Sequence, residues 1–421
     1  MSSENTITSV GQVNVTKAHI VTSNGKRLDI MGLISDLTFY EDIFSNTMSG
    51  YLLIQDALDL IGQLPLIGQE NFELVMQTPT LSEKIEKTFY IYKMKNRMVD
   101  TRSTTYMLHF CSLELISSAN SKVSKAFSGD ISDTVVSIYS DNRYLASKSL
   151  LYVDKTKNSY SFIAPFWTPL ETINWLAGKS LNAKGVPNYL FFESNKSFEF
   201  VSISTLMTAN PIRNYTYSDI SGDTAYGVNG SIDAKYSLVE AIGSEVTFDY
   251  LRNLNAGMYA SKLYTFDLTN KNIDVSTFDY IDDFNKSNHL QEYPLKTSDL
   301  ARKKIASLYF IEKNNFQTGT FKNQNYSDTF LQRNSLLEQV SAFKLNIKVF
   351  GRTDIKVGNT ITFTVNELRQ LLKDEIDTSG KSDYFSGKYL ITAIRHQITS
   401  GTHYMFMEII SDSFVKQLIS N

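Results

Sequence analysis

The clearest structural signal in this chain is residues 343–350, which read Phe343-Lys344-Leu345-Asn346-Ile347-Lys348-Val349-Phe350. Apolar side chains occupy every second position from Phe343 to Val349, and polar side chains stand between them. Successive side chains of a strand point to opposite faces, so this period of two predicts a half-buried β-strand. One face of the strand therefore belongs to a core, and the other remains polar.

The neighbouring residues extend this strand into a larger unit. Residues 329–340 have the pattern of a helix, and residues 361–365 alternate like a second strand. Two more strands, at 389–396 and 404–410, are joined through Ser400-Gly401-Thr402, which is typical of a hairpin connection. One helix followed by four strands is enough for one face of a small barrel.

The N-terminal region contains a second strand-rich stretch. A turn is indicated at Asn24-Gly25, and Gly32 interrupts the longest of the predicted strands. Short strands at such spacing indicate a barrel or a sandwich, and we predict them at residues 13–21, 28–40, 49–56, 72–77, 88–95 and 104–115.

The pattern changes after residue 115, where helices alternate with strands. Asp130 stands at the N-cap position of a predicted helix at 131–139. Thr168 and Glu171 have capping-box spacing with Pro169 between them, which predicts the start of a second helix. A hairpin is expected from 188–193 and 197–202, turning at Asn195-Lys196. Residues 116–205 are therefore predicted to form a small α+β unit.

The remaining stretches are less regular. We predict a connecting region at 206–256 with a short helix at 238–242. A hairpin at 258–268 and 272–280 is expected to begin the second barrel. Helical excursions are expected at about 281–341, including a helix at 297–311. Two polar stretches have no assigned role: the Asn-rich 314–326, and the insert 367–383, which contains a short charged helix at 367–375.

Composition limits the class of protein. The chain has 421 residues, 42% of them hydrophobic and 12% aromatic, which suits roughly two to four β-rich domains. The net charge of −3 does not mark a nucleic-acid binder. The single cysteine, Cys111, lies among apolar residues and is expected to be a buried thiol. No basic-then-apolar leader begins the sequence, and the longest apolar run, 159–170, is too short to span a bilayer, so we expect a soluble protein made in a cytoplasm.

No catalytic, cofactor or metal signature is recognised. The sequence lacks a phosphate-binding Gly-x-x-x-x-Gly-Lys-Ser/Thr loop and a Gly-x-Ser-x-Gly elbow. His396 and His403 flank a hairpin and could approach each other, but we expect them to be polar strand ends near the surface. Glu193, Glu199 and Asp233 are the carboxylates considered for a glycosidase, and any chain of this length offers such candidates. We therefore expect a protein that is not an enzyme.

Two sequence segments carry a resemblance to a known family. The first runs through Phe39-Tyr40-Glu41-Asp42, Ile54-Gln55-Asp56-Ala57 and Leu64-Pro65-Leu66-Ile67-Gly68-Gln69-Glu70; the second is Lys356-Val357-Gly358 followed by the Thr-rich strand and Tyr389 to His396. Together they resemble the central baseplate hub protein of contractile-tailed, T-even-like bacteriophages, which is related to the N-terminal hub module of the type VI secretion spike. The resemblance covers roughly residues 28–205 and 257–412.

The resemblance implies a fold, an assembly and a location. The fold class is α+β, mainly β, with two tail-tube-like antiparallel β-barrels at 1–115 and 257–421 and the α+β unit inserted between them. Three copies would present six similar barrels, so a homotrimer would join a six-fold tail tube to a three-fold spike. The implied partners are the central spike protein, the tail tube protein, baseplate wedge proteins and the tape-measure protein, and the implied location is the virion after assembly in a host cytoplasm.

The polar strand faces give the candidate site. A ring of such subunits would leave a lumen through which DNA passes without sequence-specific binding and without membrane insertion of the protein. The side chains that could line it are Lys344, Asn346, Lys348, Thr360, Thr362 and Thr364. A plain solvated sheet face explains the same pattern equally well. A tail-tip protein of a non-contractile phage, a tail-associated cell-wall hydrolase and a carbohydrate-binding adhesin remain as alternative functions.

Overall fold

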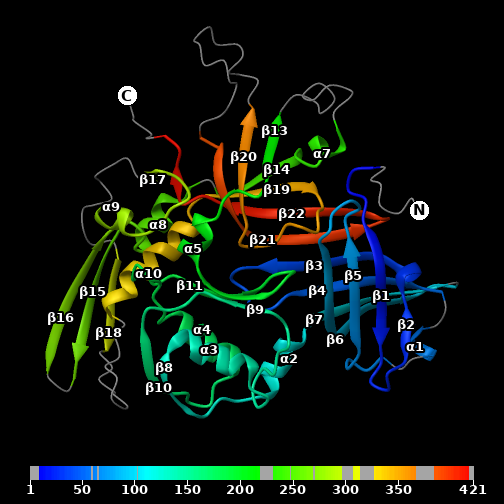
Figure 1. Ribbon diagram of the computed structural model, residues 1–421, viewed down its shortest axis with the longest axis horizontal. Coiled ribbons are helices and arrows are strands. Elements are labelled where there is room, and N and C mark those ends of the chain that lie inside the picture. Colours follow the sequence, from blue (N-terminus) through cyan, green and yellow to red (C-terminus); the bar gives the residue numbers. More distant parts are fainter. Residues whose placement is uncertain are drawn as a thin grey trace, which may run out of the picture.

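A computed structural model describes residues 9–57, 60–63, 66–101, 103–218, 231–246, 248–268, 271–295, 307–312, 327–366 and 384–416. The fold class is α+β and mainly β, as the sequence predicts. Figure 1 shows an elongated molecule, with the barrel strands side by side, an α+β unit below them and a separate small sheet at one end. The predicted stretch 314–326, the insert 367–383 and the first part of the predicted helix 297–311 lie outside the described residues.

The first barrel is built from consecutive strands. Its strands follow the spatial order β3-β4-β7-β6-β5-β1-β2. They are β1 (Asn14–Val21), β2 (Arg27–Asp29), β3 (Ile34–Asp42), β4 (Ser49–Asp56), β5 (Asn71–Gln77), β6 (Lys84–Val99) and β7 (Thr104–Ser112), with α1 (Leu60–Gln63) before β5. The long strand expected at 28–40 is present but bends at η2 (Met31–Leu33), so β2 pairs with β1 while β3 pairs with β4. Ile30 N donates to Ala18 O at 2.9 Å at this bend, which closes the barrel.

One boundary of the first barrel differs from the prediction. The strand expected to reach residue 115 ends at Ser112, and α2 (Leu113–Asn120) begins immediately after it. Ser112 has extended backbone dihedrals at the helix N-cap. Cys111 is buried beside this boundary, as predicted, and burial followed by the nearby Glu193 charge raises the pKa of its thiol to about 11.

The second barrel closes through strands that are far apart in the sequence. The order is β14-β19-β22-β21, with β20 pairing both β21 and β13. The strands are β13 (Asn214–Ser218), β14 (Val239–Val246), β19 (Lys344–Phe350), β20 (Thr360–Asn366), β21 (Gly387–Thr399) and β22 (Thr402–Ile410). A parallel bridge between Thr216 and Leu238, with Thr216 N donating to Ser237 O at 2.9 Å, joins β13 to the start of β14. The four strands predicted at 343–410 and the preceding helix, α10 (Ser327–Val340), are confirmed.

Two predictions about this barrel were wrong. The short helix expected at 238–242 is strand β14, because Ile242 pairs opposite Ile347 and the segment completes the barrel wall. The hairpin expected at 258–280 forms as β15 (Ala260–Asp267) and β16 (Asn272–Asp279), but β15 pairs with β18 (Ser307–Glu312) instead of joining the barrel. The end of the predicted helix 297–311 is therefore a strand.

The α+β unit follows the predicted plan. It comprises β8 (Ala126–Asp130), α3 (Ile131–Ser140), β9 (Leu151–Val153), β10 (Ser159–Ile163), α4 (Pro169–Ala177), β11 (Tyr189–Glu193), β12 (Phe198–Ser202) and α5 (Ile203–Thr208). The Thr168–Glu171 capping box of α4 is present in both directions. Asp130 does stand at the N-cap of α3, but its carboxylate accepts a hydrogen bond from Ser159 Oγ at 2.6 Å and makes no capping bond.

The excursion between β14 and β19 packs beside the second barrel. It contains α8 (Tyr250–Asn255), α9 (Tyr280–Asp283), η3 (Phe284–Lys286), β17 (Tyr293–Pro294) and α10; α7 (Ile232–Lys235) precedes β14, and β23 (Ser413–Phe414) follows β22 and pairs with β17. Arg333 of α10 donates to Pro187 O at 2.9 Å and Tyr189 O at 3.2 Å, which ties the helix to the α+β unit. His289 Nδ1 lies 2.6 Å from Asp412 Oδ2, which ties the excursion to the end of the barrel.

The apolar core is divided in the same way as the sheets. One cluster fills the first barrel, a second fills the second barrel, and a third lies inside the α+β unit. Phe192, Val201, Ile203 and Met207 of the α+β unit belong to the cluster of the second barrel. The unit is therefore packed against that barrel as part of its core.

Candidate functional site

The two barrels share one continuous sheet. Beyond its pairing with β20, strand β21 pairs with β3 from Ala393 to Thr399, opposite Asp42 to Asp36. Backbone hydrogen bonds therefore run without interruption from β19 of the second barrel to β7 of the first. The outward side chains of these strands form a single surface, which we call the shared face, and it is the candidate functional site.

A row of aromatic and cationic side chains crosses the shared face. Lys348 stands opposite Phe406, Phe406 opposite Arg395, and Arg395 opposite Tyr40. The Arg395 guanidinium lies 3.8 Å from the Phe406 ring centroid, and Lys348 Nζ lies 4.2 Å from that of Tyr404. Contacts between cations and ring faces at these distances are attractive. Burial, followed by the neighbouring Tyr51, raises the pKa of Tyr40, so this phenol is neutral at physiological pH.

The lysines of the shared face are paired with carboxylates. Lys344 Nζ lies 3.2 Å from Glu408 Oε1, and Lys348 Nζ lies 2.7 Å from Glu240 Oε2. Both pairs are partly exposed, so each contributes little to stability. Their effect is on the field of the surface, since each of these two lysine charges is offset by a carboxylate within the same face.

The six side chains predicted to line a lumen fall into two groups. Lys344, Asn346 and Lys348 lie on the shared face of β19, beside Glu408, Phe406 and Tyr404 of β22. Thr360, Thr362 and Thr364 lie on β20, which pairs with β13 and with the start of β21 instead of with β19. Thr360 is fully buried and donates to Ala209 O at 2.9 Å, so its prediction as a channel-facing residue was wrong.

A buried polar chain joins the two barrels beneath the shared face. Glu41 Oε1 of β3 lies 2.8 Å from His396 Nε2, and His396 Nδ1 lies 3.0 Å from His403 Nε2. Asn195 N and Val357 N also donate to Glu41 Oε2, at 3.0 and 3.4 Å. The side chains of Glu41, His396 and His403 are all fully buried. The two histidines do approach each other, as the hairpin position allowed, but their expected place near the surface was wrong.

One arrangement of protons satisfies the hydrogen bonds between Glu41, His396 and His403. When His396 donates Nε2–H to the Glu41 carboxylate, its Nδ1 accepts from His403 Nε2–H. His403 Nδ1 is then unprotonated, and it has no hydrogen-bond partner among the described residues. Burial, followed by the adjacent His396, lowers the pKa of His403 far below its usual value. Glu41 was missed in the sequence, although its place two residues after Phe39 on the inward face of a strand indicated a buried carboxylate.

The turn between β11 and β12 inserts between the barrels. Glu193 accepts from Met48 N at 2.9 Å and lies 2.8 Å from Lys87 Nζ, both in the first barrel. Asn195 Nδ2 donates to Ile355 O at 2.8 Å, and Lys356 pairs with Glu199, both contacts with the second barrel. Because one turn bonds to both barrels, it fixes their relative position.

The three carboxylates considered for glycoside hydrolysis have separate structural partners. Glu193 and Glu199 are buried and hold the contacts just described. Asp233 is exposed at α7 and accepts from Arg213 Nη2 at 2.9 Å. A glycosidase requires two carboxylates that face one cleft. Glu193, Glu199 and Asp233 lie on β11, β12 and α7, and each is held by different partners.

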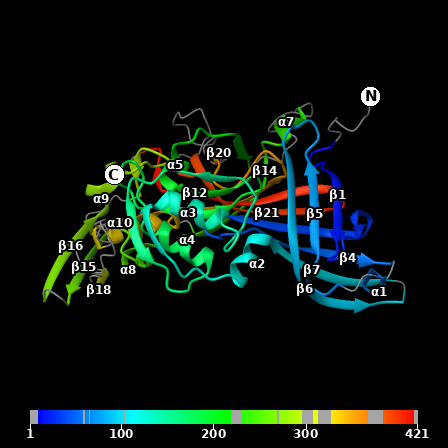
Figure 2. The ribbon, with the colours of Figure 1, turned by 60° about the horizontal axis from the view of Figure 1, so that its bottom comes forward.

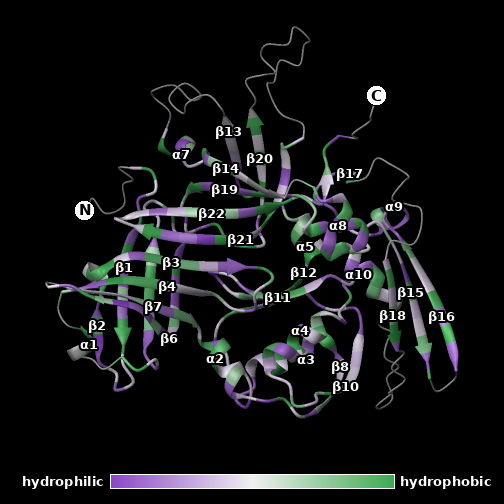
Figure 3. Cartoon of the chain, turned by 180° about the vertical axis from the view of Figure 1, so that it is seen from behind, coloured by the Kyte–Doolittle hydropathy of each residue, from purple (hydrophilic) through white to green (hydrophobic). Residues whose placement is uncertain are grey.

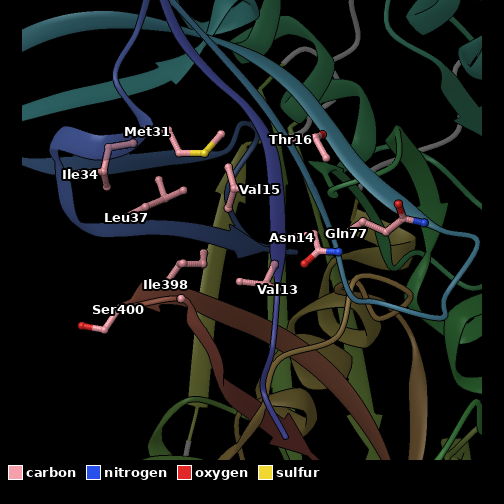
Figure 4. Close-up of a pocket in the computed structure, with 11 residues that line it drawn as sticks. Val13, Asn14, Val15, Thr16, Met31, Ile34, Leu37, Gln77, Ile398 and Ser400 are labelled. Atoms are coloured by element: carbon pink, nitrogen blue, oxygen red, sulfur yellow. The ribbon is translucent and has the colours of Figure 1, made fainter. Parts of the chain in front are cut away.

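An open cavity of about 760 Å³, lined by both apolar and polar side chains, lies at the mouth of the first barrel (Figure 4). Figure 4 shows Val15 of β1 and the preceding Val13 facing Leu37 of β3, with Ile398 and Ser400 from the end of the β21–β22 hairpin. The side chains that line the cavity are Val13, Asn14, Val15, Thr16, Met31, Ile34, Leu37, Gln77, Ile398 and Ser400, and Gly401 completes the wall. Its lining contains no ionisable side chain, so nothing in it could act as the general base that would activate the hydroxyls of Thr16 or Ser400.

The described residues contain neither a metal cluster nor a membrane-spanning helix. In that part of the chain, His, Cys, Asp and Glu side chains form no group of three or more suited to a metal ion. Likewise, the described helices include none with the length and apolarity needed to cross a membrane.

Comparison with solved structures identifies the fold. A tail protein from Neisseria meningitidis MC58 superposes with a TM-score of 0.55 at 10% identity, covering 94% of this chain and 96% of that one. A 43 kDa tail protein from prophage MuSo2 of Shewanella oneidensis gives a TM-score of 0.56 at 9% identity, covering 94% and 98%. No protein-family model matches the sequence. No curated protein matches it either. The chain has the fold of phage tail proteins, which confirms at the level of the fold the resemblance seen in the sequence.

Proposed function

We propose that this chain is a structural baseplate hub protein, which forms a trimeric ring between a six-fold tail tube and a three-fold central spike. The observation that carries the proposal is the joining of two barrels edge to edge through β21 and β3. Three copies around an axis would place six barrels in a ring, so a three-fold assembly presents six similar modules to a six-fold partner. The protein acts through symmetry and mechanical support, without catalysis.

The shared face is the proposed wall of the channel. Lys344, Asn346 and Lys348 belong to it, and Thr362 and Thr364 remain candidates on the adjoining strand. The pairing of the two lysines with Glu408 and Glu240 supports a wall that passes a polyanion without holding it. DNA binding usually depends on unpaired cations that displace the counterions of the phosphates.

The partners follow from the same assembly. The spike protein, the tail tube protein, baseplate wedge proteins and the tape-measure protein would contact the ring, and the protein would be found in the virion tail. We propose the domain division 1–115, 116–205, 206–256 and 257–421 along the sequence. The second barrel takes β13 and β14 from the connecting region, and β15, β16 and β18 form a separate sheet within the last segment. A tail-tip protein of a non-contractile phage would have the same subunit plan. A gene for a sheath protein beside this one would favour a hub protein of a contractile tail over that alternative.

Electron microscopy of the purified protein, alone and mixed with its spike protein, tests the proposal. We expect three-fold rings with a central hole and six peripheral lobes of density. A particle without a hole, or a protein that stays monomeric in both samples, would contradict it.

A further inference from the structure

The small sheet at one end of the molecule has one side that the described residues cover and one side that they leave uncovered. On the covered side, the ring of Tyr309 lies 5.1 Å from that of Phe330 in α10, and Asn334 of α10 donates to its hydroxyl at 3.1 Å. Leu308 and Phe310 precede and follow Tyr309 on β18, so their side chains point to the other side. They are 46% and 63% exposed, respectively.

The uncovered side carries apolar side chains on all three strands, with Lys262 and Glu312 beside them. Tyr264 stands opposite Val275 on β16 and opposite Phe310 on β18, and Phe266 stands opposite Ile273. The Tyr264 and Phe310 rings stack at 5.3 Å. Ile273 and Val275 are 56% and 51% exposed. We call this surface, made of six side chains, the bare face: Tyr264, Phe266, Ile273, Val275, Leu308 and Phe310. A contiguous exposed apolar sheet face usually marks an interaction surface.

A second exposed apolar site lies at the opposite end of the molecule. Met98 and Val99 at the end of β6 are 67% and 70% exposed. Figures 1 and 2 place this end of β6 and the β15–β16–β18 sheet at opposite ends of the longest axis. Figure 3 shows hydrophobic stretches on the strands of the small sheet at its outer edge.

The two ends carry opposite charge. Residues 93–99 read Lys-Met-Lys-Asn-Arg-Met-Val and carry a net charge of +3, so we call this segment the basic tip. On the side of the bare face, strand alternation places Lys262, Asp279 and Glu312 around the apolar side chains, a net charge of −1. Lys262 Nζ lies 4.8 Å from the Tyr264 ring. Opposite charges around apolar centres steer two surfaces together and select their orientation.

We infer that the occupant of the bare face is a second copy of this chain, whose basic tip packs against it. This contact rests on the ring proposed above and identifies its subunit interface. A contact between two different surfaces is heterologous, and such contacts close into rings when the rotation allows. Because the two surfaces lie at the ends of the long axis, successive copies join end to end around the channel.

Paired substitutions test the inference by measuring molar mass during size-exclusion chromatography. We expect the wild type to elute as a trimer and the Val275→Glu/Phe310→Glu variant as a monomer with unchanged circular dichroism. Leu150→Glu/Ile163→Glu is the matched control, because these residues of the α+β unit are similarly exposed, at 71% and 60%. The control should remain a trimer.

Disulfide trapping tests which surface meets the bare face. In a Met98→Cys/Val275→Cys variant, oxidation should produce covalent two- and three-chain species on a non-reducing gel, and neither single variant should do so. Cys111 is buried, so it does not compete for the reaction.

The possible outcomes separate the inference from the proposed function. A wild-type trimer that survives Val275→Glu/Phe310→Glu, or that forms no trapped species, overturns the interface and leaves the ring standing. A wild type that stays monomeric both alone and mixed with its spike protein overturns both. A wild-type dimer that the bare-face variant dissociates overturns the end-to-end contact in favour of two bare faces packed together.

Discussion

The two barrels have similar walls but are assembled in different ways. Every strand of the first barrel lies between Asn14 and Ser112, and one bent segment closes it. The second barrel combines β13 and β14 with β19 to β22, and the excursion with β15, β16 and β18 lies between these two groups in the sequence. The first barrel is therefore determined by local chain order, whereas the second depends on contacts between distant segments.

The buried hydrogen bonds of Glu41, His396 and His403 lie at the junction of the two barrels. Breaking them gives the most severe test of whether the barrels unfold as one cooperative unit. We expect Glu41→Leu to lower the free energy of unfolding by about 3–5 kcal/mol, since it leaves buried His396 and two backbone N–H groups without their acceptor. Chemical denaturation should show one transition at lower denaturant. Glu86→Leu is the control, because its pair with Lys84 is exposed. Two separated transitions in the wild type would show that the barrels unfold independently.

A glycine substitution tests how tightly the second barrel is packed at the junction. A Cβ added at Gly351 would lie 2.1 Å from His403 Cγ, so Gly351→Ala should destabilise the protein by about 1–3 kcal/mol through overpacking. Gly243→Ala in β14 of the same barrel is the control, since its Cβ would meet nothing closer than 3.9 Å. Equal thermal stability of the two variants would contradict this account.

Two buried histidines should respond to pH in opposite directions. Burial and the nearby His396 lower the pKa of His403, so its contribution to stability is lost as pH falls below the ordinary value of 6.5. Burial also lowers the pKa of His289, but the hydrogen bond and charge of Asp412 outweigh it and raise the pKa overall. The contribution of His289 is full below pH 6.5 and is lost as pH rises through its raised pKa.

Unfolding free energies measured from pH 5 to pH 8 check both directions. His403→Gln should flatten the acid side of the wild-type curve, and His289→Gln should flatten the alkaline side. A curve unchanged in shape by both substitutions would rule out the two assignments.

The smallest expected effect lies outside both barrels. Thr168→Ala removes the side chain that accepts from Glu171 N and should cost about 1 kcal/mol. Ring formation should be unaffected, because the cap is local to α4. A change in oligomeric state would mean that the α+β unit takes part in assembly.

The sequence predicted the elements whose signal is local. The alternation from Phe343 to Val349 requires only one buried face, and the capping box at Thr168 requires only four residues. Strand β14 was missed because its partner, β19, lies about a hundred residues away and Gly243 interrupts its apolar pattern. The hairpin β15–β16 was recognised, but local pattern cannot tell which sheet a hairpin joins.

The candidate site was predicted only in part. Lys344 and Lys348 were identified from the polar side of one strand, but their pairing with Glu408 and Glu240 depends on the tertiary register. Thr360 looked outward by alternation, yet the chain at Ala209 covers it. The Glu41–His396–His403 chain joins residues more than 350 positions apart, so no short pattern in the sequence connects them.

Strand β21 is a structural member of both barrels, and this has a mechanical consequence. Its seven register pairs with β3 lie along the line between the barrels. A force parallel to the strands would load all of these pairs together in shear, whereas a force across them would open the pairs one at a time from an end. A subunit pulled along β21 should therefore resist rupture more strongly than one whose barrels are pried apart.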